Sequence, residues 1–496
     1  MPTLQRFCAA LLFCVMSNAV LADECYVIGD TSKNNASKPV GSKQNPYGSL
    51  ADVELDASCK TIIVLYSGVV LDGGISLRDG QELKGKKGPA QALPIISNTT
   101  VANNGHGVQL AEENSIANLH VTDTQNSGVH GGDVGKLSIQ NSLITRFALS
   151  GDVFQAPPPL DFASNPSAGI EINPTADVKI RISDTEIGEA NSTSVGIISL
   201  AGHADIVIED VSIRDQGHLA GATTSNGIAV FSLGQSSVDL RVQDTSVSNI
   251  GAPGSNSDAL LFLAVEASAM KVLIDGYSYD NPDGDGSGSA TGIEVGTFFG
   301  NGASFEGTIT NSVIRGAKGR GIQAIDQAPG VGNFLDVHIR DNEIYDSSSG
   351  IGVDVGFGAE NGTHIVRIEE NLIVDPIFDG IAWGNAFAPQ TLVQVLIQRN
   401  TVINAGFDGL FFIQVGGASV DSLHLDAGLG ILGSQGKNRI IGSQGADVAA
   451  IAINADPFTA DAANNWWGSD AGPATVTEDG ASVIYEPFLF EDPGTD

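Results

Sequence analysis

The sequence predicts an all-β fold, a right-handed parallel β-helix in which a single chain winds into stacked coils. The first observation is a segment of the form apolar-x-[Asp/Asn/Glu/Arg]-x-x-apolar that recurs along most of the 496 residues. Its later copies begin at Ile309, Ile339, Ile368 and Ile397, at intervals of 30, 29 and 29 residues. A fixed period of this length is typical of stacked units that bury their apolar faces only against their neighbours. The second observation is a Gly-apolar step in each copy, at Gly169, Gly196, Gly227, Gly292, Gly321, Gly350, Gly380 and Gly409.

The third observation is that the repeated segments are strands and not helices. Apolar and polar residues alternate within them, as in Val337-His338-Ile339, which places successive side chains on opposite faces. The turns between them, such as Gly251-Ala252-Pro253-Gly254, are too short and too rich in Gly and Pro for crossover helices. The Leu-x-x-Leu-x-Leu pattern of leucine-rich repeats and the Trp-Asp signal of propellers are absent, so a parallel β-helix is favoured.

The first residues have the features of an export signal. Arg6 provides a positive charge, residues 7–15 are apolar, and Val20-Leu21-Ala22 is a small-residue cleavage site. We therefore expect residues 1–22 to be removed near Ala22 and the mature protein to be secreted or periplasmic. No later segment approaches the roughly 20 apolar residues that span a bilayer, so membrane insertion is not expected.

Two cysteines remain after the signal, Cys25 and Cys59, and in an oxidising compartment they are expected to form a disulfide. The open end of a solenoid needs a cap. We interpret residues 23–60 as an N-terminal cap that the disulfide pins, with a short helix after Asn45 whose apolar side carries Leu50, Val53 and Leu55. The β-helix would span residues 61–455, and residues 456–496 would form a C-terminal cap or tail.

The repeat resembles that of the secreted right-handed parallel β-helix proteins of the pectate-lyase-like superfamily. The resemblance covers roughly residues 61–468 and includes Asn464-Asn465-Trp466-Trp467-Gly468-Ser469, which is similar to a closing motif of many β-helix repeat proteins. It implies the fold and, as an expectation, a polysaccharide partner. The superfamily hosts lyases, glycoside hydrolases, epimerases and non-enzymatic adhesins, so the resemblance does not fix a reaction.

The charge of the chain limits the kinds of partner. With 24 Lys and Arg against 58 Asp and Glu, the formal net charge is −34. Such a surface repels nucleic acids and anionic membranes. It also disfavours a strongly anionic polysaccharide unless a local cationic patch binds it. We expect no nucleic-acid partner, and we expect a monomer.

One group of cations could form such a patch, namely Arg315, Lys318 and Arg320. In a lyase, one cation neutralises the carboxylate of a uronic acid and a Lys, Arg or His removes the adjacent proton. These three are the candidate catalytic residues. The alternative is that they are turn cations that pair with nearby carboxylates. The following coils add candidate substrate-binding residues, which are His338, Arg340, His364 and Arg367.

A second candidate site consists of acidic residues directly before the Gly step. Asp379 and Asp408 are 29 residues apart, so they should lie on adjacent coils about 4.8 Å apart. Paired carboxylates suit a glycoside hydrolase, whose acid needs a raised pKa. Asp before Gly is also an ordinary turn former. The Asn-Thr-Asp and Asp-Asp signatures of polygalacturonase-type hydrolases are absent, and only Gly105-His106-Gly107 resembles their Gly-His-Gly step.

The loop from Asp280 to Gly286 places oxygen ligands at Asp280, Asn281, Asp283 and Asp285. Oxygen-rich loops of this kind bind Ca²⁺, which is therefore the candidate cofactor. The Glu expected at position 12 of an EF-hand is missing, because Gly292 stands there, and a flexible turn without metal is the alternative.

The aromatic residues give one further expectation. Trp383 and Phe412 share the parity of the inward apolar positions and should fill the core. Phe411 has the opposite parity and is the better surface candidate.

The sequence therefore predicts a secreted protein that binds or processes polysaccharide along one flank of the β-helix. A lyase acting on a uronic-acid polymer is the first reaction class, and a glycoside hydrolase that uses the paired Asp residues is the second. No short motif identifies catalysis. A non-enzymatic structural or adhesive rod is thus the alternative.

Overall fold

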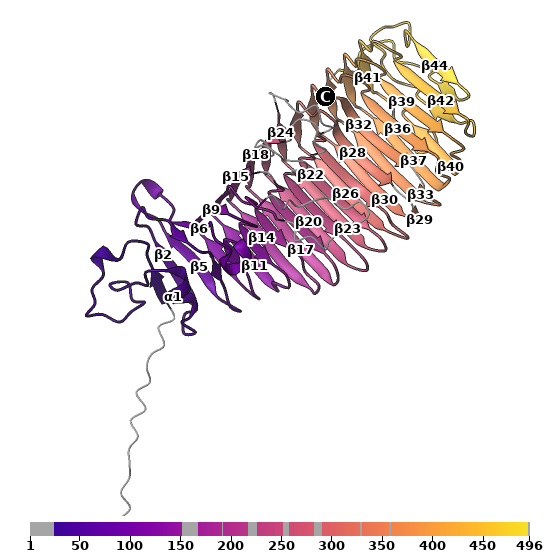
Figure 1. The fold of residues 1–496 in the computed structure, drawn as a ribbon. Helices are drawn as coiled ribbons and strands as arrows, with labels where there is room; N and C mark the ends of the chain where they lie inside the picture. Colours follow the sequence, from indigo (N-terminus) through magenta and orange to yellow (C-terminus); the bar gives the residue numbers. More distant parts are fainter. Residues whose placement is uncertain are drawn as a thin grey trace, which may run out of the picture.

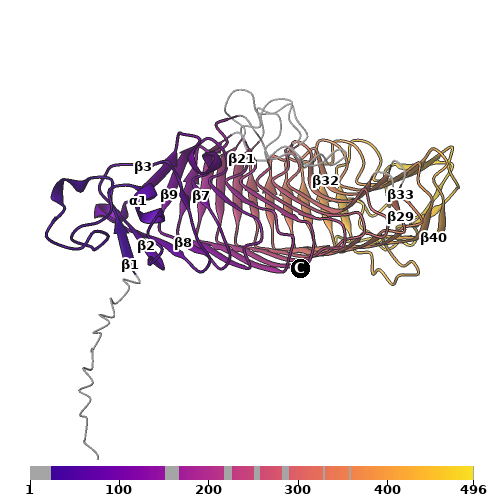
Figure 2. The same ribbon diagram turned by 60° about the horizontal axis from the view of Figure 1, so that its bottom comes forward.

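The structure is a computed structural model that describes residues 24–150, 167–190, 192–216, 226–250, 257–281, 290–327, 330–356 and 359–494. These residues wind into a right-handed parallel β-helix, which confirms the predicted fold class (Figure 1). The coils stack along one axis and their strands form three long sheets (Figure 2). The predicted signal peptide, residues 1–22, lies outside the described part of the chain.

The first sheet has 16 strands, in spatial order β1 (Glu24–Val27), β2 (Thr61–Leu65), β5 (Glu82–Lys86), β8 (Ser115–Ala117), β11 (Lys136–Gln140), β14 (Val178–Ser183), β17 (His203–Glu209), β20 (Ser237–Gln243), β23 (Ala269–Asp275), β26 (Ser304–Thr310), β30 (Phe334–Arg340), β34 (Thr363–Glu369), β37 (Gln390–Gln398), β40 (Val420–Asp426), β43 (Thr459–Asp461) and β45 (Ser482–Ile484).

The second sheet has 14 strands, β4 (Ile75–Ser76), β7 (Val108–Gln109), β10 (Val129–Gly131), β13 (Ile170–Ile172), β16 (Val195–Ser199), β19 (Ile228–Ser232), β22 (Leu260–Val265), β25 (Ile293–Phe298), β28 (Arg320–Gln327), β32 (Ser349–Gly356), β36 (Ile381–Ala386), β39 (Leu410–Val415), β42 (Val448–Ile453) and β44 (Val476–Asp479).

The third sheet has 13 shorter strands, β3 (Leu71–Asp72), β6 (Ile95–Asn98), β9 (His120–Thr124), β12 (Leu143–Thr145), β15 (Glu186–Ala190), β18 (Ser212–Gln216), β21 (Ser246–Ile250), β24 (Ser278–Asp280), β27 (Val313–Arg315), β31 (Glu343–Tyr345), β35 (Leu372–Val374), β38 (Thr401–Ile403) and β41 (Arg439–Ile441). A further pair is formed by β29 (Gly330–Val331) and β33 (Ala359–Glu360).

The register confirms the repeat that the sequence predicts. Ile309 pairs with Ile339, Ile339 with Ile368, and Ile368 with Ile397, all with buried side chains. Each coil therefore adds one apolar residue to the same row, and the rows make one continuous core. Gly196 is the exception among the Gly steps, because it pairs with Glu171 and so lies two positions later than Gly169.

A stack of buried asparagines lies inside the turn that follows the first sheet. Asn342, Asn371, Asn400, Asn438 and Asn465 come from consecutive coils, and each donates from Nδ2 to Oδ1 of the next at 2.9–3.0 Å. Asn465 belongs to the closing motif, whose Trp467 is also buried. This ladder was not predicted from the sequence.

The predicted core aromatics are confirmed. Trp383 pairs with Phe412, and their side chains are 1% and 0% exposed. Phe411, whose side chain points to the opposite face from that of Phe412, is partly exposed as predicted.

The N-terminal segment contains α1 (Leu50–Glu54) and three short 3-10 helices, η1 (Thr31–Lys33), η2 (Pro89–Gln91) and η3 (Ala102–Gly105). Ser49 caps α1 by accepting a hydrogen bond from Asp52 N at 3.1 Å. Leu50 and Val53 are buried as predicted, but Leu55 is 84% exposed because the helix ends at Glu54. None of the helices in the described residues has the length and apolar character needed to span a bilayer.

The first and last strands of the first sheet come from the two segments predicted as caps, and the boundaries at residues 61 and 455 stay a prediction. Residues 24–27 form β1, which pairs with β2 and thus begins the first sheet. At the other end, β43, β44 and β45 add strands to the sheets beyond residue 455.

The structure contains the predicted disulfide, which joins Cys25 in β1 to Cys59 over a separation of 34 residues. Closing a loop of this length should stabilise the folded protein by about 3–4 kcal/mol. We expect the Cys25→Ser/Cys59→Ser variant to lose about 3–4 kcal/mol of unfolding free energy when the N-terminal segment is unfolded in urea. A reductant should lower the midpoint of the wild type and leave that of the double variant unchanged. Equal responses of the two proteins would contradict this prediction.

Candidate active site

The structure does not bring the three predicted catalytic cations together. Arg315 ends β27 in the third sheet, where its guanidinium lies 4.6 Å from the ring centre of Tyr345. Lys318 is exposed in the following turn. Arg320 begins β28 in the second sheet, and its Nη1 lies 2.6 Å from Asp354 Oδ2. A turn therefore separates Arg315 from Arg320, and each has a partner of its own.

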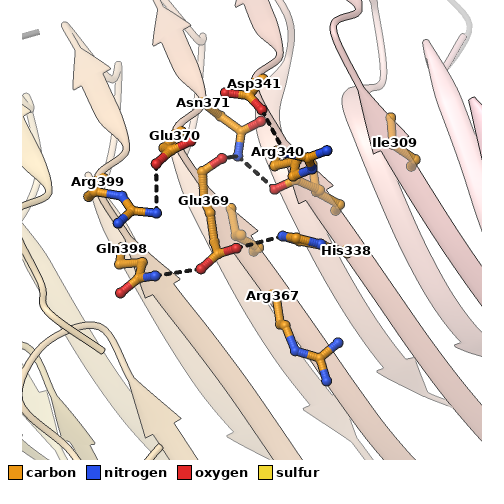
Figure 3. A network of polar contacts seen from close by, with 12 residues as sticks. Ile309, His338, Arg340, Asp341, Arg367, Glu369, Glu370, Asn371, Gln398 and Arg399 are labelled. Atoms are coloured by element: carbon orange, nitrogen blue, oxygen red, sulfur yellow. Dashed lines mark hydrogen bonds and ion pairs between the residues drawn. The ribbon is translucent and has the colours of Figure 1, made fainter. Parts of the chain in front are cut away.

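The predicted binding residues His338, Arg340 and Arg367 lie on a different face, the outer side of the first sheet. Figure 3 shows His338 and Arg340 in a network of polar contacts, with Arg367 beside it. His338 Nε2 lies 2.6 Å from Glu369 Oε2, Arg340 Nη1 lies 3.3 Å from Asp341 Oδ2, and Arg367 Nη1 lies 2.8 Å from Asp336 Oδ1. His338 and Arg367 line a hollow of 640 Å³ on this sheet. Because each cation is paired, this face has the arrangement expected of solvated surface charges.

His364 does not belong to that face, because it points into the coil. Its side chain is 0% exposed, and its Nε2 lies 2.9 Å from Oδ2 of Asp326, which is also buried. Asp326 accepts two more hydrogen bonds, from Thr297 Oγ1 and Asn333 Nδ2, both at 2.7 Å. A polysaccharide on the surface cannot reach this pair, so His364 is not a substrate-binding residue.

The predicted calcium loop is described only in part. Asp280 and Asn281 precede the gap in the described residues, and Asp283 and Asp285 lie within it. The Asn281 side chain is 5% exposed. Within the described ranges, the group of potential metal ligands close enough to share an ion is Cys25, Asp56 and Cys59, whose cysteines form the disulfide. Calcium binding by the loop stays a prediction.

Asp379 and Asp408 are neighbours on adjacent coils, as predicted. Asp379 Oδ1 accepts a hydrogen bond from Asp408 N at 3.2 Å, and Asp408 Oδ1 accepts one from Ala446 N at 2.6 Å. Both carboxyls therefore make the contacts to backbone amides that are expected of ordinary turn-forming Asp residues. Burial raises the pKa of both carboxyls, and the charge of Asp408 raises that of Asp379 further.

A cluster of carboxylates that the sequence analysis did not single out surrounds Arg320 on the outer side of the second sheet. Glu294 of β25 pairs in register with Gln323 of β28, and Asp354 lies on the next strand, β32. Arg320 Nη1 and Gln323 Nε2 both contact Asp354 Oδ2, at 2.6 and 2.7 Å. Asp258, two residues before β22, completes the cluster. We call Asp258, Glu294, Arg320, Gln323 and Asp354 the acid cluster.

A glycine makes the Arg320–Asp354 contact possible. Arg320 crosses Gly352 to reach Asp354, and a Cβ at Gly352 would lie 1.6 Å from Arg320 Nη1. The contact is an ion pair in which Nη1, a buried atom, makes no hydrogen bond of good geometry. Asp354 Oδ1 lies on the side of Gly384, where a Cβ would be 3.6 Å away.

Glu294 is the unusual member of the acid cluster. Burial raises its pKa well above the ordinary range, and the negative charges of Asp258 and Asp354 add to this, while Arg320 opposes it. Burial also raises the pKa of Asp258 to about 7, against hydrogen bonds from Thr291. In the described part of the chain Glu294 has no hydrogen-bond partner, although its side chain is partly exposed. Burial and the neighbouring negative charges thus favour the protonated form of this partly exposed carboxyl.

A second polar cluster on the same sheet is closed. Burial raises the pKa of Glu171 to about 7, but its carboxylate is bound by Ser127 Oγ and Asn173 Nδ2. The rings of His106 and His130 stack beside it with centroids 4.2 Å apart. Burial lowers the pKa of His106 to about 4 and that of His130 to about 3. The Glu171 carboxylate thus has hydrogen-bond partners, which Glu294 lacks among the described residues, and Glu171 is 2% exposed.

No family model matches the chain, and no curated protein matches its sequence. Solved structures with a similar fold include the catalytic domain of a GH87 alpha-1,3-glucanase, with 13% identity and a TM-score of 0.48. That match covers 78% of this chain and 66% of the other. For the GH136 lacto-N-biosidase of Eubacterium ramulus the identity is 14% and the TM-score 0.39, with 81% and 68% covered. For the A-module of the mannuronan C-5 epimerase AlgE4 of Azotobacter vinelandii, the identity is 12% and the TM-score 0.36. That match covers 94% of this chain and 100% of the other. These likenesses assign no reaction or substrate to the chain.

Proposed function

We propose that the protein is a carbohydrate-active β-helix protein that hydrolyses glycosidic bonds of a neutral polysaccharide at the acid cluster. The observation that supports this most directly is Glu294, which is partly exposed, is not bound by any described hydrogen-bond donor, and has a raised pKa. A glycoside hydrolase needs such a group to protonate the leaving oxygen.

The second carboxylate of the reaction would be Asp354. Arg320 and Gln323 hold its Oδ2, and Oδ1, which has no hydrogen-bond partner among the described residues, would activate water or attack the sugar. Two strand spacings separate β25 from β32, which is about 10 Å between the backbones. The two carboxyls of a glycoside hydrolase flank the scissile bond, so the sugar would lie over Gln323, which is on the strand between them.

The charge around Arg320 gives less support to a uronate lyase. Of the predicted cations, Arg320 is the one that lies in the acid cluster, and Asp354 already neutralises it. Asp258, Glu294 and Asp379 lie close enough to interact electrostatically within this region. A uronate would be repelled when any of these carboxyls is ionised. A neutral glycan has no such penalty, and it can donate hydroxyl hydrogen bonds to carboxylates.

The test is activity on a panel of neutral and uronate polysaccharides, followed both as new reducing ends and as absorbance of unsaturated product. We expect reducing ends from a neutral glycan, and we expect Glu294→Gln to lower kcat by about 10²–10⁴-fold. Glu306→Gln is the matched control, because Glu306 pairs with Lys271 on the first sheet and is 49% exposed. Unsaturated product from a uronate would instead support elimination, and no product from any polymer would support the non-enzymatic rod.

The pH profile provides a second readout of the same assignment. A general acid works while protonated, so kcat should fall as pH rises through the pKa of Glu294, which burial raises. Asp258→Asn removes one of the charges that raise this pKa, so the alkaline limb should move to lower pH. A limb that Asp258→Asn leaves in place would contradict the role of Glu294.

A further inference from the structure

Two phenylalanines are exposed on consecutive coils beside the acid cluster. The side chains of Phe378 and Phe407 are 53% and 56% exposed, and Phe407 N donates to Phe378 O at 3.1 Å. Phe378 directly precedes Asp379, and Phe407 directly precedes Asp408. The two residues therefore share one row along the axis, with their backbones about 4.8 Å apart.

The turn itself does not require aromatic residues in this row. Backbone hydrogen bonds continue the row to Ser348 and Gly319 on one side and to Gly445 on the other. These neighbours have small side chains, so the two rings are flanked by coils that leave them uncovered. The fold buries several large aromatics, among them Phe231, Phe262, Phe305 and Phe412, whereas Phe387 and Phe490 are exposed. Phe378 and Phe407 differ from these in being exposed and aligned on consecutive coils.

The row runs directly from the acid cluster. Arg320 pairs in register with Ser349, and the same turn position on the next two coils is Asp379 and then Asp408. On the strands of those coils the outward positions after Gly352 and Asp354 are Ala382 and Gly384, and then Phe411 and Ile413. The surface next to the two rings thus consists of small or apolar residues and begins at Asp354.

Polar groups suited to sugar hydroxyls lie beside the rings. The backbone hydrogen bond to Asp379 uses Oδ1, so Oδ2 of this partly exposed carboxyl can accept from a hydroxyl. Asp408 is 4% exposed and supports the turn below it. Apolar and aromatic surface with a few fixed polar groups is the usual composition of a small-molecule site. An anionic chain would meet the charge of these carboxylates here, whereas a neutral sugar presents hydroxyls and a C–H face.

We propose that Phe378 and Phe407 are sugar-binding subsites, so that a neutral glycan lies along the helix axis from the acid cluster toward the C-terminal end. The proposal rests on the function proposed above, because it takes the acid cluster as the place of cleavage. The rings would stack on successive sugar units, and Asp379 would accept a hydroxyl hydrogen bond at the edge. The expected loss for removing both rings is about tenfold in affinity, which corresponds to about 1.4 kcal/mol.

The experiment measures binding separately from catalysis. Full-length Glu294→Gln protein is run in affinity gels that contain dextran, laminarin, xylan or galactomannan, with alginate and polygalacturonate as anionic probes. We expect retardation by a neutral glycan, and we expect Phe378→Ala/Phe407→Ala in the same background to weaken it by about tenfold. Phe490→Ala is the matched control, because Phe490 is 69% exposed and lies in the C-terminal segment. It should leave binding unchanged.

The outcomes separate this proposal from the proposed function. Weakened glycan binding without any hydrolysis by the wild type would support the subsites and overturn the hydrolase. Unchanged binding in the double variant, or no retardation by any neutral glycan, would overturn the subsites. In that case hydrolysis that still depends on Glu294 would leave the proposed function standing. If the double variant instead changes the mass of the protein in light scattering, the rings form a contact between copies and the proposal is overturned.

Discussion

Replacing Asp326 with alanine is expected to destabilise the protein by about 3–5 kcal/mol, the range typical of breaking a buried ion pair. Both side chains of the pair with His364 are buried, with exposed fractions of 1% and 0%. The substitution would leave the His364 ring, the Thr297 hydroxyl and the Asn333 amide without their acceptor. Urea unfolding gives the global loss, and hydrogen exchange in β28 and β34 gives the local one.

The control for this prediction is an ion pair of similar type on the surface. Asp336→Ala breaks the pair with Arg367, whose partners are 30% and 41% exposed, and should cost no more than about 1 kcal/mol. Similar losses in the two variants would contradict the importance of burial.

The contribution of Asp326 should also depend on pH. Burial raises the pKa of this carboxyl, but the hydrogen bond and charge of His364 and the bonds from Asn333 and Thr297 outweigh burial and lower it. A carboxyl with a lowered pKa stabilises the folded state above its unfolded value of about 3.9 and loses that contribution as pH falls. The difference between wild type and Asp326→Ala should therefore shrink below about pH 4.

The second large effect is expected at the centre of the asparagine ladder. Asn400 donates from Nδ2 to Ile368 O at 2.8 Å and accepts at Oδ1 from Asn371 N at 3.0 Å. Asn400→Ala would leave these buried groups unpaired and would also break the ladder on both sides. At about 1–3 kcal/mol for each unsatisfied group, we expect a loss of about 4 kcal/mol. The measurement is the urea midpoint of the variant.

Asn301→Ala is the control for the ladder. Asn301 is exposed and accepts one hydrogen bond, from Val331 N at 3.2 Å, so its loss should cost about 1 kcal/mol or less. If Asn400→Ala is no worse than Asn301→Ala, the ladder does not hold the turns together.

The repeat could be predicted from the sequence because the interior of a coil imposes it. A buried position in every coil must be apolar, so Ile309, Ile339, Ile368 and Ile397 recur at nearly constant intervals. The disulfide followed from compartment and count, since two cysteines remained to pair. Asp379 and Asp408 were placed correctly for the same reason as the Ile row.

The candidate site was harder to predict, because nearness in sequence is not nearness on a face. Arg315 and Arg320 are five residues apart, but a turn between two sheets separates them. His364 and Arg367 are three residues apart in one strand, so they face opposite sides. That difference in parity was available from the sequence. Glu294 and Asp354 carry a weaker signal, a lone carboxylate at an outward position of an otherwise apolar strand.

The stacking of β25, β28 and β32 has a consequence for how such a site can change. Glu294, Gln323 and Asp354 come from three successive coils, one residue each. Sideways movement of a functional group is therefore possible only in whole strand spacings of about 4.8 Å, by exchanging residues between coils or by gaining or losing a coil. Adjustment along the strand comes in steps of two residues, because a step of one turns the side chain inward. New specificities on this surface would then arise in discrete steps, by moving a side chain from one strand position to another or by changing the length of a turn.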